Sequence, residues 1–527
     1  MVTTTKKRNR LKIERMCLTF SLFLSVLHLC AQTIPNVNSL SAIERDFHFN
    51  LFEDRYFQMP SLLNQSNLQK FSYGELNYLY SEGELRHPQD YKKQNGLYLE
   101  TASLASLKDT NWTLYGSLEY LNTRKEDIEN NLTYGITENS SPYYLFQETT
   151  GLWNHQDYNF KVSAANALNS KLTLGAYLNY DTSFYFRKTD TRNELTALKV
   201  QTKVALSYQY TPKHVFSLAL SNEFYKTDSA LGNKFPENNT ATTANYYLNT
   251  GLGSYIKNIE TGFETKRNIP ELQLFWLTKQ DGWDLSIESA TEYGVERWRD
   301  KNIVNIEEND ELSKYSFVKE QLHIFYNTYQ ADKLMSLRLK AEYLKGSGEV
   351  WQDAGAYYYK NFKTTSYNVK AEADVLFYNA FLNKVSVGVN YYNKSQFDLN
   401  YAYTYDFQYI DPEIAIGLNK SISSKTAFFA NFSALYHLTL HVEHDPFAAN
   451  NIYVDWIGNK MAYFTEIDAF NVNTKLGFDI KLKAKNRLEC TLTTAYTKAT
   501  ELPVSSESYY ANSDDYLNIT AGLKLYF

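Results

Sequence analysis

The sequence has little cysteine and, after its first 31 residues, no long apolar run. Of its three cysteines, Cys17 and Cys30 lie in the N-terminal segment. If that segment is removed, Cys490 remains alone, which excludes an intramolecular disulfide and a thiolate metal cluster. No later apolar stretch approaches the ~20 residues that a membrane helix requires. A chain of this kind can cross a membrane only with β-strands.

Basic charge is scarce as well. The chain carries 53 Lys and Arg residues against 59 Asp and Glu residues. Loss of residues 1–31 removes six basic residues and Glu14, which leaves a net charge of about −11. No basic patch remains to neutralise phosphates, so we expect no nucleic-acid partner. Glycine loops that cradle phosphates are absent too, because no helix follows Gly346-Ser347-Gly348.

The first 31 residues predict a signal peptide. Six basic residues lead into an apolar stretch from Met16 to Leu29, which is too short to span a bilayer comfortably. A small residue at the cut favours cleavage between Ala31 and Gln32. In the alternative interpretation Cys30 is lipidated, but the bulky Leu29 before it disfavours that reaction.

Aromatic residues are plentiful, with 45 Tyr and 31 Phe, and many lie in alternating segments. In the last segment of the chain, which ends at Phe527, every second residue from Leu517 to Leu525 is apolar, and Leu523 is one of them. Successive side chains of a strand point to opposite faces, so one face is apolar and the other can meet water. The alternation recurs in segments near the ~9 to 11 residues that a tilted strand needs to cross lipid. These segments are 112–120, 172–180, 283–293, 334–344, 367–377, 385–391, 428–436 and 472–482.

Charged residues on the polar face separate a barrel from a sandwich. In segment 334–344 the polar face carries Arg338, Lys340 and Glu342, which do not suit a sandwich core. A long soluble β-protein, such as a propeller or solenoid, is the alternative, but no short repeat of fixed period supports it. We predict an all-β fold: a transmembrane, antiparallel, up-and-down β-barrel of about 18 strands, within a range of 14 to 20.

The connections alternate between short and long. Tight polar turns, such as 169–171 and 280–282, alternate with longer segments, which include 123–155, 297–312, 346–364, 442–464 and 500–513. Short periplasmic turns and long outer loops are typical of bacterial barrels. We therefore expect an outer-membrane protein with both termini in the periplasm. Residues 1–31 are predicted as signal peptide, residues 32–66 as a periplasmic arm or small plug, and residues 67–527 as the barrel.

A narrower resemblance rests on the segment from Ser41 to Gln65, with its aromatic stretch Phe47-His48-Phe49, and on two short motifs. These motifs are Ser141-Pro142-Tyr143-Tyr144 and Glu148-Thr149-Thr150-Gly151. On these grounds the chain resembles an uncharacterised family of outer-membrane β-barrel proteins from the Bacteroidota. The resemblance implies a barrel over nearly the whole mature chain. Because the function of that family is unknown, it implies no catalytic or binding residue.

One cluster of histidines is a candidate metal site. On the strand that begins at Phe428 the apolar residues take even numbers, which predicts His437, His441 and Glu443 on the inward face. His437 and His441 would lie ~13 Å apart on a strand, too far to share one ion. His441 and Glu443 with a loop ligand remain candidates for Zn²⁺. We expect no cofactor, and Cys490 shares the lipid-facing parity of Leu488 and Leu492.

Three functions remain open from the sequence. The first is a pore or uptake channel whose selectivity the long loops define. The second is a plugged platform for surface anchoring, adhesion or assembly without transport, and the third is a barrel-embedded hydrolase, although no nucleophile motif is present. The expected partners are the lipid bilayer, the barrel-assembly machinery and a surface protein or glycan. Phe527, Leu525 and Leu523 are predicted to form the barrel-assembly signal.

Overall fold

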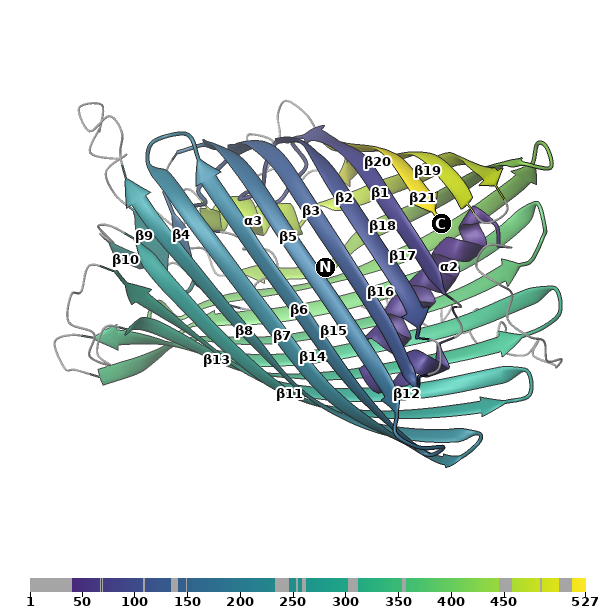
Figure 1. Ribbon diagram of the computed structural model, residues 1–527. Helices are drawn as coiled ribbons and strands as arrows, with labels where there is room; N and C mark the ends of the chain where they lie inside the picture. The colour runs from purple at the N-terminus through teal and green to yellow at the C-terminus, as the bar shows by residue number, and fades with distance from the viewer. Residues whose placement is uncertain are drawn as a thin grey trace, which may run out of the picture.

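A computed structural model gives the fold of residues 40–66, 68, 70–107, 110–133, 141–147, 149–232, 246–252, 255–257, 262–301, 311–352, 357–444, 457–483, 486–501 and 514–527. An 18-stranded antiparallel sheet forms the wall of a barrel (Figure 1). Its strands are β1 (Phe71–Gly83), β2 (Lys93–Ser106), β3 (Trp112–Ile128), β5 (Gly151–Ala167), β6 (Leu172–Arg187), β7 (Arg192–Thr211), β8 (His214–Gly232), β11 (Phe263–Gln280), β12 (Trp283–Asp300), β13 (Glu311–Tyr329), β14 (Lys333–Gln352), β15 (Tyr357–Phe377), β16 (Leu382–Asp398), β17 (Tyr403–Ser421), β18 (Thr426–His444), β19 (Asp468–Lys483), β20 (Asn486–Glu501) and β21 (Asp515–Tyr526).

The sheet closes on itself between its first and last strands. β1 pairs with β21 from Tyr73 opposite Tyr526 to Gly83 opposite Tyr516. Each of the other wall strands pairs with the wall strands before and after it in the sequence. Closure satisfies the hydrogen bonds of both edge strands, as a membrane requires. The predicted barrel of about 18 antiparallel strands is confirmed.

The two faces of the wall follow the predicted alternation. On β21 the side chains of Leu523 and Leu525 are exposed, whereas that of Tyr526, the last residue of the strand, is buried. On β12 Asp284 and Ser286 are buried inside the barrel. Cys490 lies opposite Leu523 in the register of β20 and β21, on the outward face. Apolar side chains therefore face outward and polar ones face the lumen, as in a membrane barrel.

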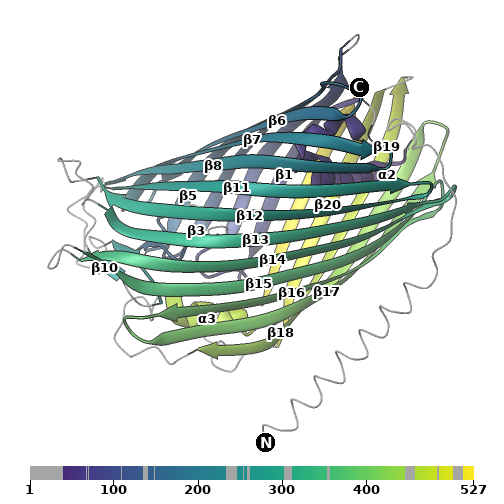
Figure 2. The same cartoon turned by 90° about the horizontal axis from the view of Figure 1, so that it is seen from below.

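The wall strands are 12 to 21 residues long. The expected long connection over residues 346–364 is wrong, because β14 continues to Gln352 and β15 begins at Tyr357. Backbone pairing between these strands continues up to Gln352 and Tyr357, well beyond the length that crosses lipid. The predicted tight turns join strand pairs at one end of the barrel, here named the short-turn end. The opposite end is the loop end (Figure 2).

The remaining elements are short. A second sheet contains β4 (Tyr144–Phe146), β9 (Tyr247–Asn249) and β10 (Tyr255–Lys257). The helical segments are α2 (Ala42–Phe52), η2 (Glu53–Phe57), η3 (Pro60–Gln65) and α3 (Asn459–Thr465). In the part of the chain that the structure describes, no helix has the length and apolar character needed to cross a membrane.

Candidate functional site

Residues 40–66, here named the plug segment, fold inside the barrel at the short-turn end (Figures 1 and 2). A capping box begins α2: the backbone N–H of Glu44 donates to the Ser41 hydroxyl, and the Ser41 N–H donates to the Glu44 carboxylate at 2.8 Å. This pairing satisfies amide groups that a helix start otherwise leaves without partners. The Glu44 carboxylate also accepts a hydrogen bond from Asn383 of the wall at 3.0 Å.

Two apolar clusters seat the plug segment on the wall. The first joins one face of α2 to β14, β15 and β18, and its members are Ala42, Ile43, Phe47, Leu51, Leu334, Leu376 and Phe429. The second joins the end of α2, η2 and η3 to β1, β3, β7, β8, β11 and β21 through buried residues such as Phe52, Leu62 and Tyr115. Both clusters remove apolar surface from water and so stabilise the docked position.

Two buried arginines tie the plug segment to carboxylates of the wall. Arg45 contacts Glu489 directly and lies 3.0 Å from Asp479. Arg55 lies 2.8 Å from Asp284. Both arginine side chains are fully buried, so removal of Arg45 would leave the buried carboxylate of Glu489, and removal of Arg55 that of Asp284, without its ion-pair partner.

Further charges pair across the same interface. Asp54 lies 3.1 Å from Arg338 and 2.7 Å from Lys340, and Asp46 lies 2.5 Å from Lys475. These inward charges of the wall, Arg338, Lys340 and Lys475, thus have partners in the plug segment. The sequence shows the inward parity of Asp284 and Asp479, but it does not show which group each faces.

A second layer occupies the loop end of the lumen. β4 and β9 pair with each other, and their residues Leu145 and Leu248 are buried. These two residues join a large core cluster that includes Trp153, Trp298 and Phe362 of the wall. α3 enters the same cluster through Ala462. Inward-folded loop segments therefore narrow this end of the barrel.

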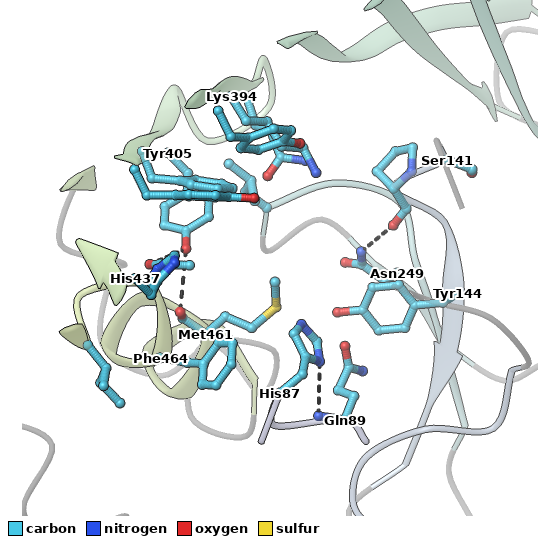
Figure 3. Close-up of a pocket in the computed structure, with 18 of the residues that line it drawn as sticks. His87, Gln89, Ser141, Tyr144, Asn249, Lys394, Tyr405, His437, Met461 and Phe464 are labelled. Carbon is cyan, nitrogen blue, oxygen red and sulfur yellow. Dashed lines mark hydrogen bonds between the residues drawn. The ribbon is translucent and has the colours of Figure 1, made fainter. Parts of the chain in front are cut away.

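A cavity of about 540 Å³ lies between this layer and the wall, and we name it the loop-side cavity (Figure 3). Its volume falls within the ~300 to 1,000 Å³ of small-molecule sites. The lining comes from the segment between β1 and β2, from β4, β9 and α3, and from wall strands such as β16, β17 and β18. Residues far apart in the sequence therefore meet here.

One wall of the loop-side cavity is aromatic. The rings of Tyr392 and Tyr409 stack at 5.1 Å and 25°, and Phe407 lies 5.7 Å from Tyr392. His437 packs on Tyr409 at 4.6 Å, and its Nδ1 lies 2.7 Å from a carboxylate oxygen of Asp411. Phe464 of the opposite side packs against His87 at 5.9 Å.

Polar groups without partners also line this cavity. The side-chain amides of Gln89 and Asn249 donate to the carbonyls of Asn130 and Pro142, at 2.9 and 2.7 Å. Their amide oxygens, Oε1 and Oδ1, are buried and accept no hydrogen bond from the described residues. Lys394 has neither an ion pair nor a hydrogen bond within the described ranges. Burial, together with the positive charges of Lys394 and Arg86, lowers the pKa of His87 to about 4.

The predicted metal candidates lie outside this cavity. A register shift between Gln408 and Tyr409 of β17 leaves Leu440 of β18 unpaired and reverses the parity beyond it. The inward placement predicted for His441 and Glu443 is therefore wrong: both side chains are exposed, and Val442 between them packs against the inner core.

The two candidate ligands nevertheless lie close together. His441 Nε2 and Glu443 Oε2 are 3.4 Å apart. Within the described residues, no group of three His, Cys, Asp or Glu side chains is arranged to hold a metal ion. Asp445, the neighbouring carboxylate of the loop, lies outside those residues.

A profile of one protein family, described as a family of unknown function, matches residues 60–527. The chain belongs to this family, DUF6850. The predicted resemblance to an uncharacterised family is confirmed by this match, whereas its placement in the Bacteroidota stays a prediction. Among curated proteins, the DUF6850 chain has no match.

Solved structures resemble the DUF6850 barrel at low identity. BauA, the ferric preacinetobactin receptor from Acinetobacter baumannii, is 7% identical, with 87% of this chain and 81% of that chain covered and a TM-score of 0.39. The ferric yersiniabactin uptake receptor FyuA from Yersinia pestis is 9% identical, with coverages of 87% and 79% and a TM-score of 0.39. The CymD monoaromatic hydrocarbon channel is 10% identical, with coverages of 89% and 90% and a TM-score of 0.27.

At these TM-scores the similarities carry no argument about what the DUF6850 barrel binds. Its closed sheet and apolar outer face are those of an outer-membrane β-barrel.

Sequence reasoning missed the groups that organise both ends of the lumen. The capping-box pattern Ser41-Ala42-Ile43-Glu44 was a usable signal for α2, because it marks a helix start. Nothing local marks Lys394, Gln89 and Asn249, since each comes from a different segment and they meet only in the folded barrel.

Proposed function

We propose that this protein is a gated uptake channel of the outer membrane, with the short-turn end in the periplasm. The observation that carries the proposal is the plug segment, which fills the lumen at that end without being part of the wall. A freely open pore does not fit this arrangement. A channel that opens when residues 40–66 leave or shift does fit it.

The contacts of the plug segment suit a reversible closure. Its ion pairs connect α2 and η2 to β12, β14, β19 and β20. Residues 40–66 contain no cysteine, so no disulfide ties the plug segment to the wall. Arg45 and Arg55 are the strongest candidates for the residues that hold the plug segment in its docked position, because each is a buried cation paired with a buried carboxylate. Removal of one partner of such a pair costs roughly 3 to 5 kcal/mol.

Single-channel recording in planar bilayers tests the proposal. We expect a closed wild-type protein, frequent openings in the Arg45→Met/Arg55→Met variant, and stable large conductance after deletion of residues 40–66. Arg124→Met is the matched control, because Arg124 pairs with Glu126 in an exposed position and such pairs contribute only ~0 to 1 kcal/mol. Folded deletion variants without conductance would refute the channel.

A plugged platform without transport is the second candidate, because the layer of β4, β9 and α3 also fills the loop end. The same recordings separate the two functions. A platform predicts a lumen that stays closed after residues 40–66 are deleted.

A further inference from the structure

The loop-side cavity combines three features that each restrict the ligand. It has an aromatic wall, two buried amide oxygens without donors, and one ammonium group without a counterion in the described part of the chain. Neither amide oxygen nor the ammonium group pairs with another described residue. Buried polar groups are normally satisfied, so each is a place where a bound molecule supplies the missing partner.

The buried amide oxygens of Gln89 and Asn249 can accept hydrogen bonds from a ligand. The nitrogens of Gln89 and Asn249 already donate to backbone carbonyls, which fixes the orientation of both amides. In Figure 3 both side chains point into the cavity from the side opposite Tyr405. Buried acceptors without donors are unfavourable, so a ligand that donates to them gains affinity. Neutral oxygen acceptors suit the hydroxyl groups of a ligand. A ligand with an ammonium group would instead need a carboxylate partner, and the carboxylate of Asp411 is already paired with His437.

The ammonium group of Lys394 can form an ion pair with an anionic group of a ligand. Lys394 lies on the lumenal face of β16, the face that also carries Tyr392, and its neighbour across the strands is Phe407. The nearby His87 is neutral near pH 7, because burial lowers its pKa to about 4. Lys394 is therefore the charge that an incoming ligand meets on this side of the cavity.

The aromatic wall calls for a flat apolar face on the same molecule. The rings of Tyr392 and Tyr409 stack on each other, with Phe407 beside them, and together they form an apolar patch on the cavity wall. C–H groups pack well against aromatic carbon of this kind. One face of a sugar ring offers C–H groups in this way, while its rim carries hydroxyl donors.

From these features we infer that the loop-side cavity binds a small acidic saccharide, of one or two rings, that carries a carboxylate. Its C–H face lies on the aromatic wall, its hydroxyls donate to the oxygens of Gln89 and Asn249, and its carboxylate pairs with Lys394. This inference rests on the proposed function, because it names the substrate class of the channel. The volume of about 540 Å³ accommodates such a molecule.

Saturation-transfer NMR on the full-length protein in detergent tests the inference with matched sugar pairs. The pairs are glucose and glucuronate, galactose and galacturonate, and cellobiose and cellobiouronate, and each pair differs by one carboxylate. We expect the acidic member to bind roughly tenfold or more tightly, as one charge-assisted hydrogen bond predicts. Lys394→Met should remove this preference, and Lys394→Arg should keep most of it.

Lys213→Met is the control, because Lys213 lies in an exposed turn at the short-turn end. Each variant is first shown to fold by its heat-modifiable migration. The inference is overturned if acidic and neutral sugars bind equally or if neither binds. It is also overturned if Lys394→Met leaves the preference unchanged, or if dipeptides or aromatic carboxylates bind more tightly than the acidic sugars. If the plug-segment variants still conduct ions in that case, the proposed channel function is retained and only the proposed ligand class is refuted.

Discussion

At the residue scale, we predict that His48 makes the docking of the plug segment depend on pH. It is 4% exposed and stacks on Tyr378. Burial lowers the pKa of His48 to about 4 although Glu44 opposes the shift. Once the plug segment is released, the ordinary pKa of ~6.5 returns. The released state therefore binds more protons between these two values, so the contribution of a neutral His48 to docking is fully present above pH 6.5 and is lost as the pH falls.

At pH 5 the expected loss is on the order of 2 kcal/mol. Planar-bilayer recordings should show more openings at pH 5 than at pH 7.5, and His48→Gln should remove most of this difference. His214→Gln, a histidine outside the plug segment, should leave it unchanged. Burial would raise the pKa of Asp46, but Lys475 and Lys524 lower it, so Asp46 keeps its charge over this range. A pH response identical in the His48→Gln variant would exclude His48 as its origin.

At the element scale, the end of β21 joins barrel closure to the predicted assembly signal. The backbone N–H of Phe527 donates to the Ser72 carbonyl at 3.1 Å, and its side chain is 58% exposed. Such a ring contributes little to the lumenal core. We therefore predict that Phe527→Ala lowers the amount of folded protein in the outer membrane several-fold and leaves the stability of the assembled barrel nearly unchanged.

Phe381 supplies the matched control, because its ring is 61% exposed in a turn at the same end of the barrel. Phe381→Ala should assemble at the wild-type level. The measurement is quantitative immunoblotting of outer-membrane fractions, together with urea titration of the purified barrel. Equal losses in both variants would show that exposed aromatic area, and not a terminal signal, determines assembly.

The elements also show where sequence patterns were sufficient. The alternation in β12, β14 and β21 gave the correct inward and outward residues, because neighbouring side chains of a strand necessarily face opposite sides. The same rule failed in β18, where one unpaired residue, Leu440, reverses the parity before His441. A bulge depends on the neighbouring strand, and hydrophobic periodicity along one segment does not record it.

At the scale of the whole molecule, closure of the 18-stranded sheet predicts unusual resistance to detergent. Every wall strand has two hydrogen-bonded neighbours, so unfolding must break a continuous ring of backbone bonds. We expect unheated protein in mild detergent to migrate faster in electrophoresis than boiled protein, and to fractionate with the outer membrane. Recovery as a soluble periplasmic protein would contradict the fold. Variants of the plug segment should keep the shift, since residues 40–66 are not part of the ring.

The sequence by itself determined the wall of this protein. Strand number, strand direction and the lipid-facing residues follow from local alternation and turn spacing, because each wall residue faces either lipid or the lumen. Only the tertiary structure decided what fills that wall. Arg45 meets Glu489 across 444 residues of chain, and Gln89, Asn249 and Lys394 line one cavity from three separate segments. Contacts of this range depend on barrel closure and register, which no short pattern along the chain specifies.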